Sequence, residues 1–120
     1  MHERQTESPE VFDRAQASEA TCGDPDLLKE IVGIFLEDCP RMVTELERAV
    51  DSGDAEAVRR AAHTLKGSVA VLGAKALAAV AKEAEHHARA GDLDAAAAAF
   101  ARVEEEAKRL VPVLEELLAG

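Results

Sequence analysis

The chain has 120 residues, of which 48% are hydrophobic, and a formal net charge of −10 at pH 7. This length suits one domain with one core and is too short for two domains of ordinary size. The acidic charge argues against a surface for nucleic acid or anionic lipid, because either ligand would require a broad positive field. We therefore expect a protein partner or a small local site, with no nucleic acid and no membrane.

The hydrophobic residues are small or aliphatic, with no Trp, no Tyr and only three Phe. Ala, Leu and Val must then supply the core, which favours close-packed helices over sheets. The first ten residues are polar, and no stretch of membrane-spanning length is free of charges. Cys22 and Cys39 are too few for a disulfide framework and have no metal-type spacing. We expect a cytoplasmic protein with reduced thiols.

The first long helix has a clear start. Asp24-Pro25 is typical of an N-cap followed by proline at the first helical position, and it predicts a helix over residues 25–51. The apolar residues of this segment recur at helical spacing, at Leu28, Ile31, Phe35, Cys39, Met42, Leu46 and Val50. A short extra helix is expected before it, around residues 11–19.

Three more long helices are expected after glycine turns, over residues 54–72, 74–90 and 92–118. Pro40 and Pro112 fall inside the first and the last long helix, where we expect local kinks. The short connections force neighbouring helices to run antiparallel. The sequence therefore predicts an all-α fold, an antiparallel up-down four-helix bundle with a short additional N-terminal helix. The domain is expected to span residues 10–120, after a flexible tail at residues 1–9.

The second long helix carries an imidazole among cations on its outer face. At about 100° per residue, the apolar side chains fall on one side and His63 on the other. Arg59, Arg60 and Lys66 stand three or four residues from His63. A solvated helix face is the ordinary explanation of such a group.

Gly67 favours a functional explanation of this face. Glycine inside a helix costs about 1 kcal/mol relative to alanine, and this helix is otherwise rich in alanine. A partner that approaches closely one turn from His63 would account for it. A neutral imidazole is a nucleophile near pH 7 and can hold a labile phosphoryl group, and a nearby lysine neutralises the phosphoryl oxygens. Ala70 lies two turns from His63 in the same row.

The run Ala62-His63-Thr64-Leu65-Lys66-Gly67-Ser68, followed by Leu72-Gly73-Ala74, resembles the signature of bacterial histidine-containing phosphotransfer (HPt) domains of two-component phosphorelays. The resemblance extends over nearly the whole chain, through the Ser52-Gly53-Asp54 and Ala90-Gly91-Asp92 turns. It implies that His63 is the phosphoacceptor, that Lys66 lies beside the phosphate and that Gly67 leaves room for a receiver domain.

The resemblance also implies a phosphocarrier without an ATP site or autokinase activity, and no glycine-rich phosphate loop is present. Its expected partners are response-regulator receiver domains or a hybrid sensor histidine kinase. The chain itself is expected to be a monomer. We expect Arg59, Arg60, Ala70 and Lys82 to contact such a partner. No acidic cluster stands beside His63, so Mg²⁺ is expected to come from the partner. A free-standing carrier and a module of a larger kinase stay equally open.

Glu85 is the carboxylate best placed to orient His63. In an antiparallel hairpin about Gly73, a residue ten positions before the turn lies level with one ten to twelve positions after it. Glu85 lies there, at the edge of the expected buried stripe of the third helix. A hydrogen bond to Nδ1, direct or through a water, would leave Nε2 free to attack. The alternative is a solvated Glu85 that pairs with Arg89 one turn on.

Two further alternatives remain. Glu83 and His87 are one turn apart and have the spacing of metal ligands, but His86 points elsewhere on the helical wheel, and we expect no metal site. A helical adaptor that docks a partner without being phosphorylated is the rival function. An adaptor would tolerate His63→Gln, whereas a carrier would not.

Overall fold

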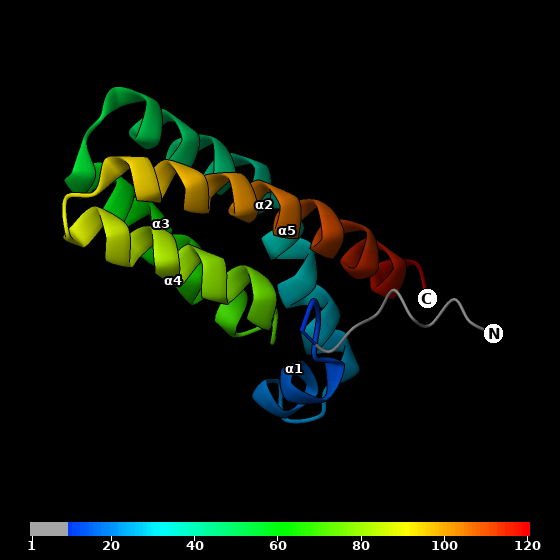
Figure 1. Ribbon diagram of the computed structural model, residues 1–120. Helices are drawn as coiled ribbons and strands as arrows, with labels where there is room; N and C mark the ends of the chain where they lie inside the picture. Colours follow the sequence, from blue (N-terminus) through cyan, green and yellow to red (C-terminus); the bar gives the residue numbers. More distant parts are fainter. Residues whose placement is uncertain (1–9) are drawn as a thin grey trace.

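The computed structural model describes residues 10–120, and every regular element in this range is a helix. A short helix α1, Arg14–Ala20, precedes four long helices (Figure 1). These are α2 (Pro25–Ser52), α3 (Ala55–Ala70), α4 (Lys75–Arg89) and α5 (Leu93–Ala119). The predicted bounds of the long helices are confirmed to within two residues at each end. The expected tail at residues 1–9 lies outside the described residues.

Aspartate side chains begin four of the five helices. Asp24 accepts hydrogen bonds from the backbone N–H groups of the first turn of α2, and Asp54 and Asp92 do the same for α3 and α5. The short helix expected around residues 11–19 is confirmed and begins at Arg14, because Asp13 is its N-cap and accepts from the backbone N–H of Gln16. Residues 11 and 12 instead point their side chains into the core.

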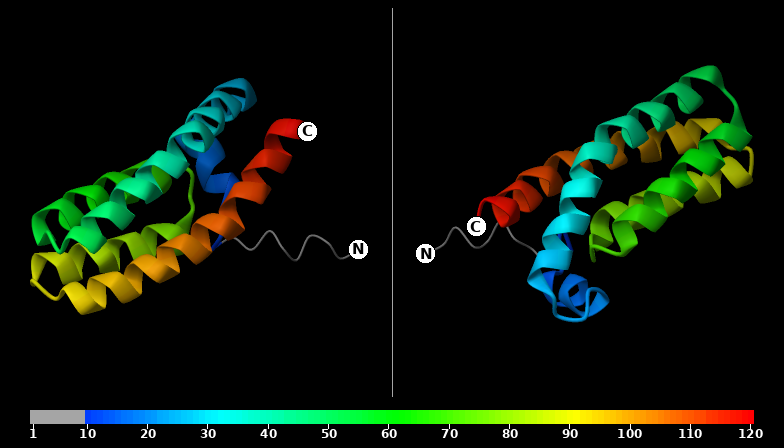
Figure 2. Two further views of the ribbon diagram at one scale, coloured as in Figure 1. Left: turned by 90° about the horizontal axis from the view of Figure 1, so that it is seen from above. Right: turned by 180° about the vertical axis from the view of Figure 1, so that it is seen from behind.

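The four long helices form the predicted bundle. Each packs against its neighbours along the chain, and α5 closes the ring by packing against α2 (Figures 1 and 2). The core is mostly aliphatic, and its largest fully buried hydrophobic side chains are Leu46, Leu65, Leu72, Leu77, Leu110 and Leu114. Small alanines face this core from α3 and α4, which lets these two helices approach closely.

Pro40 and Pro112 lie inside continuous helices. The view from behind in Figure 2 shows α2 changing direction along its length, as expected where a proline removes a backbone donor. Both prolines border one apolar hollow of about 380 Å³ between α2 and α5. Within residues 10–120, no helix combines the length and apolar character that a membrane span requires.

The segment before α2 covers the end of the bundle where α3 turns into α4. The Asp13 backbone N–H donates to the Gly73 carbonyl at 3.0 Å, and the Ala76 N–H donates to the Glu10 carbonyl at 2.7 Å. The side chains of Val11 and Phe12, which belong to this segment, are buried. These hydrogen bonds fix this end of the α3–α4 hairpin. The middle of the hairpin, which carries His63, is not covered by the segment.

Candidate functional site

His63 projects from the middle of α3. Its neighbours Ala62 and Leu65 are fully buried and anchor the helix, whereas 61% of the His63 side chain is exposed. The helix period therefore turns the imidazole away from the core and toward the flank shared with α4.

Glu85 lies on α4 directly beside this imidazole. Its Oε2 is 2.9 Å from Nδ1 of His63, so the contact expected from the hairpin register is direct and needs no water. Lys66 Nζ donates to Oε1 at 2.7 Å, and Arg89 Nη2 donates to Oε2 at 3.2 Å. Glu85 is only 5% exposed, so it is buried and not merely at the edge of the stripe. Both pairings weighed for Glu85, with His63 and with Arg89, occur together.

The surroundings of Glu85 keep its carboxylate ionised. The hydrogen bond from Lys66 is the main cause that lowers the pKa of Glu85 below its ordinary value; burial acts in the opposite direction, and His63 lowers the pKa further. An ionised carboxylate can only accept hydrogen bonds. Nδ1 of His63 must therefore carry the proton, which leaves the Nε2 lone pair free on the exposed side of the ring.

A shallow hollow of about 360 Å³ lies beside His63 and Glu85. It is lined by His63, Lys66, Lys82, Glu85, His86 and Arg89. Three cations therefore surround one carboxylate in a chain whose net charge is −10. A group with two or three negatively charged oxygens suits this hollow better than a neutral ligand.

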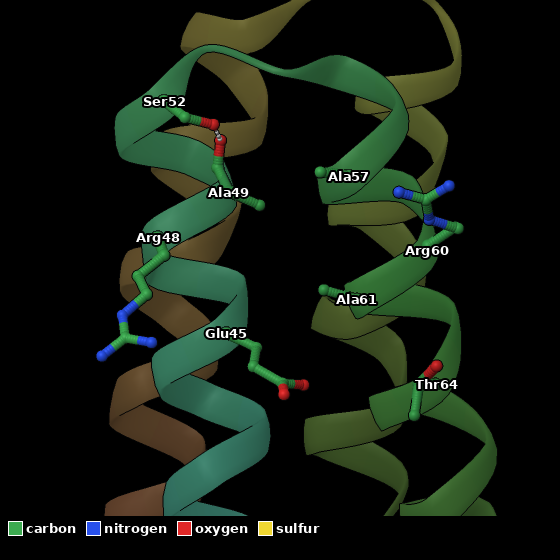
Figure 3. Close-up of a pocket in the computed structure, with 8 residues that line it drawn as sticks. All are labelled: Glu45, Arg48, Ala49, Ser52, Ala57, Arg60, Ala61 and Thr64. Carbon is green, nitrogen blue, oxygen red and sulfur yellow. Dashed lines mark hydrogen bonds between the residues drawn. The ribbon is translucent and has the colours of Figure 1, made fainter.

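The four predicted partner contacts lie on two helices, with Arg59, Arg60 and Ala70 on α3 and Lys82 on α4. Arg59 is bound to Glu56 on its own helix, with Nη2 to Oε2 at 2.6 Å, so part of its charge is neutralised. Arg60 borders a separate groove between α2 and α3, together with Arg48 and Thr64 (Figure 3). The structure thus separates Arg60 from the hollow beside His63.

Ala70 and Gly67 lie exposed on the same face of α3 as His63. A Cβ built on Gly67 would meet no other atom within 4 Å, apart from its own helix backbone and chain neighbours. Nothing inside the molecule therefore requires glycine at this position. Space for an external group remains the explanation.

Sequence reasoning missed part of the hollow. It treated Arg89 only as a competitor of His63 and assigned His86 no role at the site, yet both line the hollow. The spacing of four residues between Glu85 and Arg89 was the available signal. In the described range, Glu83 is paired with Arg102, and no group of three His, Cys, Asp or Glu side chains is arranged to hold a metal ion.

Comparisons with known proteins identify the family of the chain. A family model described as "Hpt domain" matches residues 30–117. Histidine-containing phosphotransfer protein 2 of Arabidopsis thaliana is 38% identical over 56 residues, which are 44% of this chain and only 36% of that protein.

Two solved structures share the fold. Histidine-containing phosphotransfer protein B of Pseudomonas aeruginosa PAO1 superposes with a TM-score of 0.82 at 28% identity, over 88% of this chain and 92% of that one. The HPT domain of a sensor hybrid histidine kinase from Shewanella gives 0.84 at 13% identity, over 93% and 97%, and at that identity supports the fold alone. The family match covers most of the chain and contains His63, Lys66, Glu85 and Arg89. The chain therefore belongs to the Hpt domain family.

Proposed function

We propose that this chain is a phosphocarrier of a two-component phosphorelay, in which His63 receives a phosphoryl group from a receiver-domain aspartate and passes it to another. The observation that carries the proposal is the 2.9 Å contact between Nδ1 of His63 and the buried carboxylate of Glu85. It directs a nucleophilic Nε2 away from the molecule, toward a partner.

The transfer step follows from this tautomer. Nε2 attacks the phosphorus atom, an N–P bond forms, and the P–O bond to the aspartate of the donor breaks, so that a free carboxylate leaves. The ring, which keeps its proton on Nδ1, becomes positively charged, and Glu85 stabilises that charge. Lys66, whose Nζ lies beside Glu85, neutralises the phosphoryl oxygens. Delivery to the next aspartate is the reverse reaction.

The donor and acceptor are receiver domains of response regulators or of a hybrid sensor kinase, which supply the Mg²⁺. The chain acts as a cytoplasmic monomer and consumes no ATP of its own. Gly67 and Ala70 provide the close approach, and Arg59, Arg60 and Lys82 provide charge at its margins.

Replacement of the phosphoacceptor tests this function. A receiver domain that phosphorylates the parent chain should leave an acid-labile, base-stable phosphate on it, and His63→Gln should abolish that phosphate. The matched control is His87→Gln, which removes an imidazole from α4 outside the residues that line the hollow. Label that persisted on His63→Gln would mean that another residue is the phosphoacceptor. A parent chain that bound receivers without being phosphorylated would be a docking adaptor instead of a carrier.

A further inference from the structure

Lys82 differs from the other two cations of the hollow beside His63. Lys66 Nζ donates to Oε1 of Glu85 at 2.7 Å, and Arg89 Nη2 donates to Oε2 at 3.2 Å. Lys82 lines the same hollow and is exposed, yet it forms no ion pair with any carboxylate in the described part of the chain. One of the three cations is therefore available to a group that arrives from outside.

The sequence explains why Lys82 lacks a partner. Charged side chains on a helix pair with residues three or four positions away. For Lys82 on α4 these positions hold two alanines, one histidine and a single carboxylate, that of Glu85. Glu85 already contacts three other side chains, through both of its oxygens. The charge of Lys82 is therefore not neutralised inside the molecule, although the chain has 24 acidic residues and only 14 basic ones.

The charges of the hollow suit a group with two negative charges. Three cations and the Glu85 carboxylate leave two positive charges when the histidines are counted as neutral. A phosphoryl group carries about −1.5 to −2 charges near pH 7 and has three oxygens that accept hydrogen bonds. Lys66 and Arg89 each use a donor on Glu85, whereas the ammonium of Lys82 has three donors and no carboxylate to bind.

Lys82 also lies on the side of His63 that stays open. The contact between His63 and Glu85 places these two residues level with each other on α3 and α4. Lys82 precedes Glu85 by about one turn and Gly67 follows His63 by about one turn, so both lie toward the end where α3 turns into α4. A Cβ on Gly67 would meet no atom outside its own helix backbone and chain neighbours within 4 Å. Lys82 therefore borders, from α4, the space that Gly67 leaves open on α3.

We propose that Lys82 binds the phosphoryl oxygens on Nε2 of phosphorylated His63, as a second phosphoryl-binding lysine that reaches them from α4. The inference rests on the proposed function and adds a residue to the transfer site. Lys66 has to divide its donors between Glu85 and the phosphoryl group, whereas Lys82 binds that group without giving up an ion pair. The flexible four-carbon stem of lysine allows the movement.

The other basic groups near the site are less suited to this role. Arg59 is bound to Glu56 on its own helix. Arg60 borders the separate groove between α2 and α3 (Figure 3). His86 lines the hollow, but a neutral imidazole carries no charge and donates through only one ring nitrogen. Lys82 is thus the permanent charge of the hollow that has no internal partner.

The experiment follows the titration of the phosphoryl group itself. Full-length protein is phosphorylated by a phosphorylated receiver domain, separated from it, and titrated by phosphorus NMR from about pH 9 down to about pH 5.5, a range that brackets the second ionisation of a phosphoryl group. Lys82→Ala and Lys82→Gln remove the charge, and Lys82→Arg keeps it. Lys108→Ala is the matched control, because Lys108 lies on α5 beside the apolar hollow between α2 and α5. No receiver is present during the titration, so an effect on docking does not enter.

Removal of the Lys82 charge should make the phosphoryl group harder to ionise. Its pKa should rise by about 0.5 to 1 in Lys82→Ala and Lys82→Gln, as expected when one ammonium at hydrogen-bond distance is lost from a solvent-exposed site. Lys82→Arg and Lys108→Ala should titrate like the parent. Urea unfolding of unphosphorylated Lys82→Ala should also match the parent, because no ion pair within the chain is lost.

An unchanged pKa of the phosphoryl group in Lys82→Ala would overturn the proposal. Slower transfer from the receiver would then assign Lys82 to docking, and unchanged transfer would leave it a solvated surface lysine. A parent chain without a phosphohistidine signal after incubation with the receiver is a different result. It would remove the proposed function itself, and the role of Lys82 with it.

Discussion

Lys66 connects the site to the stability of the fold. Its side chain is 30% exposed and donates a 2.7 Å hydrogen bond to the buried Glu85. Lys66→Ala should leave the helical content intact, slow transfer about tenfold or more, and lower the free energy of unfolding by about 1 to 2 kcal/mol at pH 7. Urea unfolding followed by circular dichroism, together with transfer kinetics, measures both effects.

The effect of this substitution on stability should depend on pH. The Lys66 hydrogen bond is the main reason that the pKa of Glu85 is lowered from an ordinary value of 4.5. A carboxylate with a lowered pKa stabilises the fold fully above that ordinary value and loses the contribution as the pH falls through its folded-state pKa. The difference in stability between the parent and Lys66→Ala should therefore shrink below about pH 4. A difference that stayed constant from pH 7 to pH 3.5 would mean that the hydrogen bond is not its source.

Sequence reasoning located Glu85 because an antiparallel hairpin has a calculable register. It did not separate Arg59 from Arg60, since both lie within one turn of His63. The side chains of Arg59 and Arg60 point about 100° apart around the helix axis, one on each side of His63. Arg60 therefore turns toward α2 and Arg59 toward α4. Which flank faces which neighbour depends on the handedness of the bundle, and a single helical wheel does not contain that information.

At the scale of elements, α2 and α3 each contain a glycine with open space around it. A Cβ on Gly33 or on Gly67 would meet no atom within 4 Å outside its own helix backbone and chain neighbours. Alanine at either position should therefore stabilise its helix by about 0.5 to 1 kcal/mol, through the higher helix propensity of alanine. Thermal unfolding of the two variants measures this gain.

Bulkier side chains should distinguish the two glycines. Gly67→Gln places a long side chain one turn from His63 and should weaken receiver docking and slow transfer severalfold, whereas Gly33→Gln on α2 should leave both unchanged. Titration with a receiver domain supplies the binding constant. Equal transfer rates for the two glutamine variants would contradict the view that Gly67 provides access.

At the scale of the whole molecule, the negative net charge of the chain gives no indication of the positive charge that gathers at the site. The chain carries −10 overall, yet the hollow beside His63 brings Lys66, Lys82 and Arg89 around Glu85. These residues come from two helices, and the α3–α4 turn at Gly73 determines how the helices meet. The charges could be counted from the sequence, but their convergence depends on the packing of that hairpin.

The end of this hairpin depends on the segment before α2, all of which lies outside residues 30–117, the part matched by the family model. Gly73 has a φ of +70°, and a Cβ there would lie 2.8 Å from the backbone oxygen of Asp13. Alanine would be strained in this conformation and would also push away the segment that binds Gly73 through the Asp13 N–H.

Gly73→Ala should therefore lower the free energy of unfolding by about 2 to 3 kcal/mol, more than backbone strain alone accounts for. Gly53→Ala is the matched control, because Gly53 has a φ of +71° with open space around it and should lose only about 1 kcal/mol. Urea unfolding of the two full-length variants gives the comparison. Equal losses would mean that the contact with Asp13 contributes nothing, and that the N-terminal segment lies on the hairpin without stabilising it.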